Sequence, residues 1–405
     1  MNEHAGRVLK VVLLVSCAHA LVHLLEQSIA SVELVISKEF ALSLQASGLL
    51  GMALRLPYGL GAYAAGVLAD RFGEKRILVI YLLGAAAMSV GLSTSGSVSI
   101  IYAQLFGLGA FASMYHPAGL ALLANQTTPA ERSRALGLHG VFGSLGIASA
   151  PFIAGFLLTL RPGDWRGYYL LLAAISGTLG LLVWWLLKPV PHDQNTQDHQ
   201  TGLPLHDPAF DRKPYALLVI GTAVSGMVYG GVLHFLPRYL SEANVFSGWL
   251  TSADEAALGN YTAAIALICG AFGQWVAGRL ATPNRLPLQL SAIYGLNIPF
   301  LIWMTFAEGT ARLIAACLWA FFHFMNQPVY NSLLPEYLPR RRRSAGYGFS
   351  NLMGFGVGAV GPYIVAQCGV YFPDYTYSYL TLAGLAAVAT VLPLPLIRHR
   401  HQERT

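Results

Sequence analysis

Three ionisable residues lie along one long apolar segment near the start of the chain. His19, His23 and Glu26 are spaced four and three residues apart, so on an α-helix their side chains share one face. Ionisable groups at membrane depth are costly to bury and are functional candidates by default. Histidine changes charge at about pH 6.5, and a glutamate can also carry a proton, so the three residues suit reversible proton loading. The alternative is a structural role, in which all three form hydrogen bonds to neighbouring helices.

Other polar side chains inside predicted apolar segments form a candidate substrate-binding set. Arg55 can either hold an anionic solute or pair with Glu26 or Glu33. Pro117 predicts a kink that turns the ring of His116 toward a central cavity. The complete set is Arg55, Tyr58, Tyr115, His116, Tyr229, His234, His323, Asn326, Gln327 and Tyr330. The last four follow helical spacing, which predicts a polar face opposite the helix of His116.

Two further ionisable residues are given structural or solvent roles. Glu33 lies near the outer end of its segment, where we expect it to face water. His139 lies on a segment that we expect to pack against others, so its role is interpreted as structural.

The histidines raise the alternative that a transition metal is bound. His19, His23, Glu26, His116, His234 and His323 offer nitrogen and oxygen ligands. No Cys or Met joins them and they form no compact metal motif, so we predict no metal site. The sequence also contains no nucleophile–base pair and no Walker loop. We therefore predict no enzymatic activity and no cofactor, and an ion gradient as the energy source.

The elements that must position these residues are predicted to be membrane-spanning helices. Apolar residues make up 55% of the 405-residue chain, charged residues only 11%, and the mean hydropathy is +0.53. A bilayer core of about 30 Å needs about 20 apolar residues per helix. Twelve spans are predicted, at residues 8–36, 46–69, 76–95, 98–124, 132–159, 167–187, 214–240, 257–280, 286–307, 310–333, 344–370 and 375–397. The predicted fold class is an all-α integral membrane protein.

The positions of Lys and Arg indicate how the helices are oriented. If both termini are cytoplasmic, 19 of the 25 Lys and Arg residues fall on the cytoplasmic side, as the positive-inside rule requires. The polar segment 188–213 is then a cytoplasmic linker between two domains, residues 1–187 and 214–405. The net charge of +6 is an orientation signal, and nothing indicates a nucleic-acid surface. We expect a monomeric, multi-pass protein of a bacterial inner membrane.

The two halves of the chain align at a constant offset of 211 residues. Pro117 falls on Pro328 and Gly143 falls on Gly354 at this offset. Such an internal duplication predicts two pseudo-symmetric bundles of six helices. Transporters built from parallel repeats bind their substrates between the halves, near the bilayer midplane.

A short charged loop joins the second and third predicted spans. Its sequence is Gly66-Val67-Leu68-Ala69-Asp70-Arg71-Phe72-Gly73-Glu74-Lys75-Arg76, which resembles the signature loop of the major facilitator superfamily. The resemblance implies a twelve-helix transporter that works by alternating access. It also implies gating roles for Gly66, Asp70, Arg71, Gly73 and Arg76, with Asp70 as a cytoplasmic latch. In the second half Gly278 stands near the place of Asp70, so the acid occurs in the first half only.

Two segments of the first half resemble the fosmidomycin-resistance group of bacterial exporters. They are the histidine-containing first span, which ends in a Gln27-Ser28 step, and the segment Tyr115-His116-Pro117. The chain departs from the group at His23, where the group tends to carry an Asp. A pattern in the fifth span resembles the antiporter motif of exporters, and its residues are Gly146, Pro151 and Gly155.

The resemblance and the ionisable residues together predict the function. We expect proton-coupled export of a small organic solute or drug by antiport. The alternative is transport of a transition metal or a metal chelate by the intramembrane histidines.

Overall fold

The computed structural model describes residues 3–127, 129–187, 210–246, 248, 253–339, 343–372 and 375–397, and these contain helices but no strand. The first half comprises α1 (Glu3–Glu39), α2 (Leu44–Phe72), α3 (Glu74–Ser93), α4 (Val98–Ala112), α5 (Tyr115–Gln126), α6 (Pro129–Leu160) and α7 (Trp165–Leu186). The second half comprises α8 (Arg212–Ser241), α9 (Glu255–Leu280), α10 (Leu286–Phe306), α11 (Thr310–Phe324), α12 (Asn326–Leu333), α13 (Arg343–Asn351), α14 (Gly361–Tyr371) and α15 (Thr376–Val391). A π-helix (Leu352–Val357) and a 3₁₀ turn (Gly358–Val360) join α13 to α14. Residues 188–209 of the predicted linker lie outside the described residues.

Twelve helical segments occupy the places of the predicted spans. Ten of them are long and apolar enough to cross a membrane. The other two are α2 and the α11–α12 pair, at the second and tenth predicted spans. These two carry Arg55 and His323, both buried. The predicted all-α membrane fold is confirmed.

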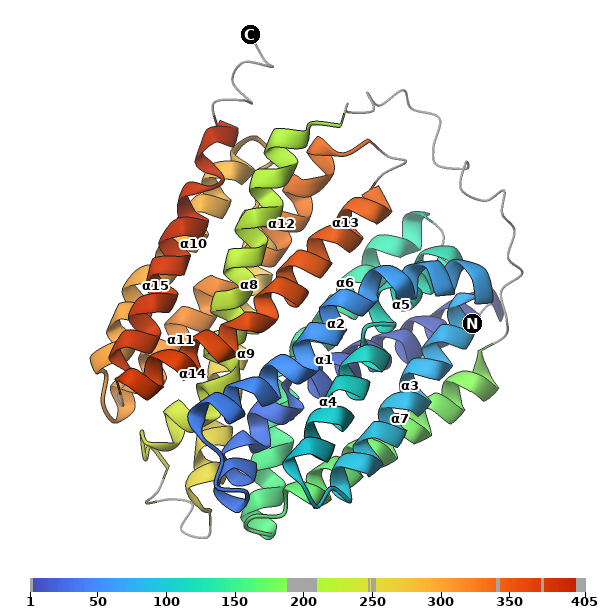
Figure 1. Ribbon diagram of the computed structural model, residues 1–405. Helices are drawn as coiled ribbons and strands as arrows, with labels where there is room; N and C mark the ends of the chain where they lie inside the picture. Colours follow the sequence, from blue (N-terminus) through green and yellow to red (C-terminus); the bar gives the residue numbers. More distant parts are fainter. Residues whose placement is uncertain are drawn as a thin grey trace.

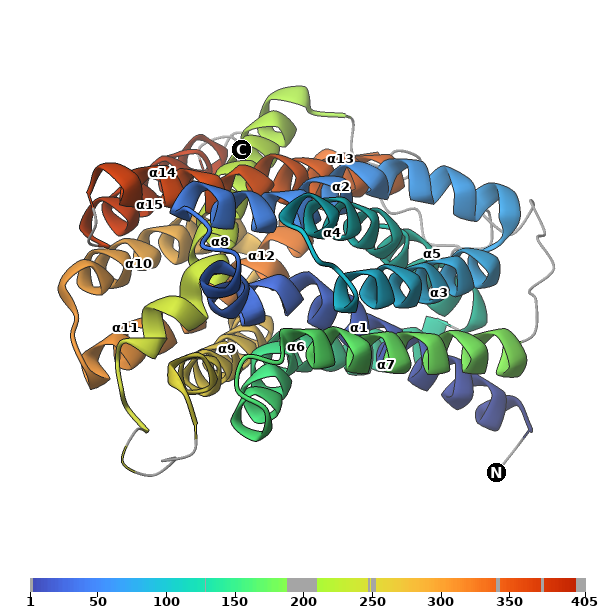
Figure 2. The same cartoon turned by 60° about the horizontal axis from the view of Figure 1, so that its bottom comes forward.

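The helices form two bundles that lie side by side (Figure 1). In the first bundle α1 packs against α6 and α3 against α7, and in the second α10 packs against α15 and α9 against α11. The bundles meet along two lines, where α6 faces α9 and where α2 faces α14 (Figure 2). The helices α1 and α8 also contact each other across the interface. The candidate proton-coupling and substrate-binding residues on α1, α2 and α8 are therefore carried by helices at the interface, and the others lie on α5, α11 and α12.

Prolines interrupt the fourth span of each half at equivalent positions. The first break separates α4 from α5 at Ser113 and Met114, and the second separates α11 from α12 at Met325. A proline has no amide N–H, and its ring clashes with the carbonyl group four residues earlier. The carbonyl four residues before Pro117 belongs to Ser113, and the one four residues before Pro328 belongs to Phe324, so both lie at the breaks and account for the interruptions. Their common position agrees with the duplication and with the predicted kink beside His116.

The two bundles are joined differently at their two ends, which we name after Glu33 and Asp70. At the Glu33 end, Lys38 Nζ lies 2.6 Å from Glu255 Oε2, and Asn260 Nδ2 donates to the carbonyl oxygen of Ser31 at 2.7 Å. Toward the Asp70 end, a methyl group added at Gly137 or at Gly348 would meet no other described atom within 4 Å. Side chains of the two bundles thus bond to each other at the Glu33 end, and Gly137 and Gly348 leave space for a side chain toward the Asp70 end.

Candidate functional site

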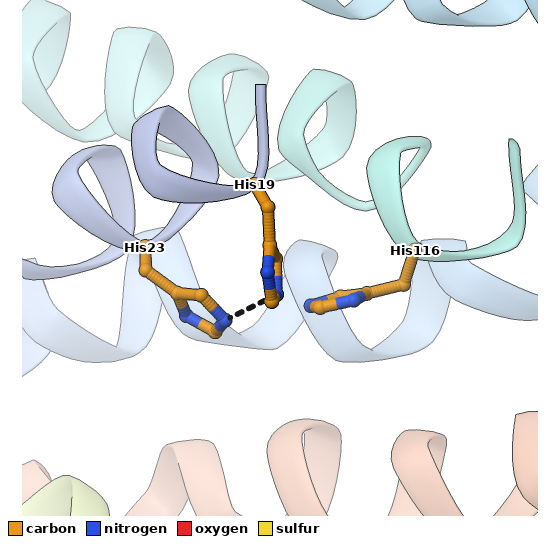
Figure 3. Close-up of side chains that lie close together, drawn as sticks. All are labelled: His19, His23 and His116. Carbon is orange, nitrogen blue, oxygen red and sulfur yellow. Dashed lines mark hydrogen bonds between the residues drawn. The ribbon is translucent and has the colours of Figure 1, made fainter. Parts of the chain in front are cut away.

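The three ionisable residues of α1 lie in a row in the buried part of the first bundle, and Figure 3 shows two of them, His19 and His23. His23 Nδ1 lies 2.9 Å from Glu26 Oε2, and His23 Nε2 lies 3.2 Å from His19 Nε2. Glu26 is only 1% exposed. The prediction that the three residues share one helix face is confirmed, and the structure adds that they contact one another directly.

The hydrogen-bond partners of the two Nδ1 atoms determine which ring nitrogens of His19 and His23 carry a proton. His19 Nδ1 donates to the carbonyl oxygen of His139 at 2.7 Å, because a carbonyl can only accept. His23 Nδ1 likewise donates to the ionised carboxylate of Glu26. In the neutral rings both Nε2 atoms are then acceptors, and they face each other at 3.2 Å. One additional proton turns this acceptor pair into a donor and an acceptor.

His139 on α6 and Tyr115 on α5 extend the row to two neighbouring helices. The ring of His139 stacks on that of His19 with the centroids 3.8 Å apart. Tyr115 Oη donates to the carbonyl oxygen of Val15, so His139 Nε2 donates to Tyr115 Oη, each at 2.8 Å. The sequence interpretation left His139 out of the site. No sequence signal could have included it, because its contact with His19 depends on the close approach of two helices, where a Cβ at Gly143 would meet the His19 ring.

The break between α4 and α5 places His116 beside the row. His116 Nε2 lies 2.9 Å from Tyr58 Oη. The rings of His19 and His23 each lie with their centroids 5.4 Å from that of His116. One ring nitrogen from each of the three histidines falls within 4.8 Å of the others (Figure 3). The structure thus forms a compact histidine cluster, which the sequence did not predict because His116 lies on another helix.

Arg55 connects the row to the second bundle. Its Nη1 donates to Glu26 Oε1 at 2.7 Å, so the two oxygens of Glu26 are divided between Arg55 and His23. The guanidinium carbon lies 5.2 Å from the ring centroid of Tyr229 on α8, within the range of a cation–π contact. Gln27 Nε2 also donates to Tyr229 Oη, at 3.4 Å. Of the alternatives stated for Arg55, pairing with Glu26 is what the structure shows.

The predicted polar face of the second half is divided among separate partners. His323 Nδ1 donates to Asn297 Oδ1 at 3.0 Å, and its ring stacks on Tyr229 with the centroids 5.8 Å apart. Asn326 Nδ2 donates to the carbonyl oxygen of His323 at 2.6 Å. Among these residues, only His323 contacts Tyr229 directly.

Gln327 and Tyr330 point to other helices. Gln274 Nε2 on α9 donates to Gln327 Oε1 at 2.7 Å. Tyr330 Oη lies 2.5 Å from Ser350 Oγ on α13. These contacts are separate from the Arg55–Tyr229 contact.

His234 and Glu33 lie together at the interface of the bundles. His234 is buried, and its Nε2 donates to the carbonyl oxygen of Ser47 at 2.9 Å. The expectation that Glu33 faces water is wrong, because its side chain is only 1% exposed. Arg238 on α8 donates to both of its oxygens, at 3.0 and 2.6 Å, and Ser37 and Ser47 donate to one of them. The sequence did not indicate the role of Arg238.

The charged loop forms the junction between α2 and α3. Gly73 has φ of +86°, a left-handed conformation that favours glycine, so it permits the tight turn. Asp70, Arg71 and Arg76 are exposed. Asp70 has no hydrogen-bonding partner among the described residues. The nearest atom to a Cβ added at Gly66 would be Pro117 Cβ, at 3.8 Å.

The chain is similar in sequence and in structure to known transporters. Residues 15–362 match the family model of the Major Facilitator Superfamily. The chain is 27% identical over 399 residues to the probable sulfoacetate transporter SauU of Cupriavidus necator, covering 90% of this chain and 88% of that protein. It is 32% identical over 134 residues to the methylenomycin A resistance protein of Bacillus subtilis, covering 32% and 27%. The crystal structure of the nucleoside transporter NupG has a TM-score of 0.72 at 14% identity, covering 95% of this chain and 99% of that one.

Proposed function

Because the chain belongs to the Major Facilitator Superfamily, we propose that it is a secondary active transporter that couples proton movement to the export of a small organic solute. The two domains, residues 1–187 and 214–405, rock against each other around the central site and are joined by the 188–213 linker. Asp70 acts as a latch at the cytoplasmic face when the Asp70 end closes. Both termini lie in the cytoplasm, and the membrane is a bacterial inner membrane.

The facing Nε2 atoms of His19 and His23 carry the proposal of proton coupling. Two acceptors 3.2 Å apart repel each other until one of them is protonated. The pair therefore provides a place for one proton, bonded through His23 to the buried carboxylate of Glu26. A group that gains and loses a proton at membrane depth is what coupling to a proton gradient requires.

The link to the second bundle supports coupling between protonation and bundle movement. Glu26 holds Arg55, and Arg55 contacts Tyr229 of the second bundle. A proton on His23 strengthens its hydrogen bond to Glu26. It therefore weakens the ion pair between Arg55 and the same carboxylate. A change of charge at His23 in the first bundle thus affects the contact of Arg55 with Tyr229 in the second bundle.

The similar proteins support a small organic solute and movement out of the cell. One is named as a probable transporter of sulfoacetate, a small organic molecule. Another is named as a resistance protein for methylenomycin A, a role that fits export. We extend both features to this chain as part of the proposal.

Transport of a transition metal is the second candidate function. It is favoured by the close approach of His19, His23 and His116, since imidazole nitrogens suit zinc, copper and nickel. In that case the histidine cluster binds the transported ion in place of the proton that His19 and His23 would share.

Flux in proteoliposomes with and without a pH gradient tests the proposal. A thermal-shift screen of drugs, organic acids and metal ions first identifies a solute that binds the protein. We expect a pH gradient to drive its flux in the wild-type protein, and Glu26→Gln to remove this dependence while solute exchange at equal pH continues. The matched control is Glu39→Gln, because Glu39 lies on the same helix but pairs with Arg166 inside the first bundle.

The outcomes separate the two candidate functions. If Glu26→Gln and His23→Gln both leave the pH-driven flux unchanged, proton coupling through this row is refuted. If His19→Ala and His23→Ala abolish the uptake of a metal ion and no organic solute is transported, the second candidate function replaces the first.

A further inference from the structure

The buried carboxylates at the interface of the bundles have no free oxygen to offer a cationic solute. Among the described residues three carboxylates are buried, those of Glu26, Glu33 and Glu74. Both oxygens of Glu26 accept hydrogen bonds, from Arg55 and from His23. Glu33 is held by Arg238 through both oxygens. Glu74 begins α3 beside the charged loop and accepts from Asn125, away from the interface.

Basic groups outnumber acids where the two bundles meet at the level of Glu26. Beside this single carboxylate lie Arg55 and the four histidines 19, 23, 116 and 139. A cation entering here meets a carboxylate that is already neutralised by Arg55, and any protonated histidine repels it further. Arg55 and a proton on one of the histidines would together outweigh the charge of Glu26, so the protonated site favours an anion.

One buried donor of Arg55 has no partner among the described residues. Nη1 is bonded to Glu26, but Nη2 is buried and makes no hydrogen bond within this part of the chain. The residue is only 3% exposed, and buried charged donors are almost always bonded. The planar edge of a guanidinium group matches the two oxygens of a carboxylate or a sulfonate.

An aromatic surface adjoins this donor on the second bundle. The ring of Tyr229 lies under the guanidinium and stacks on His323 at 5.8 Å, and His323 stacks on Trp319 at 4.8 Å. Tyr229 is partly exposed, whereas Trp319 is fully buried and supports the stack from behind. A solute held by Arg55 would therefore lie against a rigid aromatic face.

We infer that the transported solute is a small organic anion whose acidic group binds the free edge of the Arg55 guanidinium. Its organic part packs against the ring of Tyr229, so residues of both bundles hold it. The inference rests on the proposed transport function and specifies the substrate class of that site. Carboxylates, sulfonates and phosphonates share the required chemistry.

Binding to the purified protein in detergent tests this inference without any gradient. The probes are a panel of aromatic and aliphatic carboxylates, sulfonates and phosphonates, each paired with its neutral amide and with an amine of the same shape. Thermal shift and calorimetry measure binding. We expect acids to bind and their amides and amines to bind at least tenfold more weakly.

Two substitutions locate the bound acid. Arg55→Lys keeps the charge opposite Glu26 but loses the planar edge, so we expect it to weaken acid binding at least tenfold. Tyr229→Leu leaves the ion pair intact and tests the aromatic contact, with an expected loss that is larger for aromatic acids. The control is Arg312→Lys, because Arg312 pairs with Glu242 inside the second bundle.

Several results would overturn the inference. It is wrong if no acid in the panel binds, if amides or amines bind as well as acids, or if neither substitution weakens acid binding. The proposed function fails separately. If an acid binds but its flux does not depend on the pH gradient, only the proposal of proton coupling is contradicted. A neutral or cationic solute with pH-driven flux contradicts only the anionic substrate class.

Discussion

The ion pair of Glu33 and Arg238 provides a measurable test of what holds the bundles together at the Glu33 end. We predict that Arg238→Gln shifts the protein toward the state in which this end is open. The substitution leaves the carboxylate of Glu33 without its cation in a position where the side chain is 1% exposed. In an open state the same carboxylate reaches water. The substitution therefore destabilises the closed state selectively.

The size of the shift follows from the burial of the pair. Removing one partner of a buried ion pair costs about 3–5 kcal/mol. The lower value applies here, because the Arg238 side chain is 24% exposed and Ser37 and Ser47 still donate to Glu33. Since 1.4 kcal/mol is a factor of ten, about 3 kcal/mol corresponds to a change of about 100-fold in the ratio of open to closed protein.

A cysteine at a buried interface position reports the opening. In a variant without the four native cysteines, Ala257→Cys places a thiol on α9 at the Glu33 end, where Ala257 is 0% exposed. We expect Arg238→Gln to raise the rate at which an impermeant maleimide labels this thiol. The matched control is Arg312→Gln, which breaks an ion pair to Glu242 inside one bundle and should leave the rate unchanged.

An unchanged labelling rate in a folded Arg238→Gln protein would refute the reasoning. Equal increases with Arg238→Gln and Arg312→Gln would also refute it, since they would indicate general loosening of this end. The melting temperature of each variant, measured in the same detergent, separates a conformational shift from loss of the fold.

Three further predictions concern the glycines, the latch and the topology. Gly143→Ala should lower the free energy of unfolding by about 1–3 kcal/mol and slow pH-driven flux, because its Cβ would displace the His19 ring. Gly140→Ala is the control: its Cβ has free space, so thermal unfolding should change little. Asp70→Asn should reduce transport while solute binding stays intact, and near-normal transport would reduce Asp70 to a residue that anchors helix ends. A cysteine at Asn195 should react with an impermeant thiol reagent only after cells are permeabilised, and labelling in intact cells would overturn the predicted orientation.

The parts of the site that could be predicted from the sequence depend on local geometry. His19, His23 and Glu26 lie on a single helix, so their spacing alone places them on one face. The twelve spans follow similarly from the length and composition of each apolar segment. The breaks at Pro117 and Pro328 follow from the missing N–H of proline.

The parts that could not be predicted depend on how distant helices meet. His139 bonds to His19 from 120 residues away, and Arg238 bonds to Glu33 from 205 residues away. No period or motif in a single sequence records such pairs. The prediction for Glu33 is wrong for the same reason. A position near the end of a span indicates exposure to water only if no other helix covers it. Here α8 of the second bundle covers it.

The helices α1 and α8 contact each other through charged groups at two depths. Glu26 and Glu33 are seven residues apart on α1, about 10 Å along the helix axis. At the first level Glu26 holds Arg55 against Tyr229, and at the second Glu33 holds Arg238. Because Tyr229 and Arg238 both belong to α8, any movement of this helix relative to α1 strains both levels together. In the proposed mechanism, a charge change at Glu26, by a proton or by an anion on Arg55, would therefore also affect the Glu33–Arg238 contact.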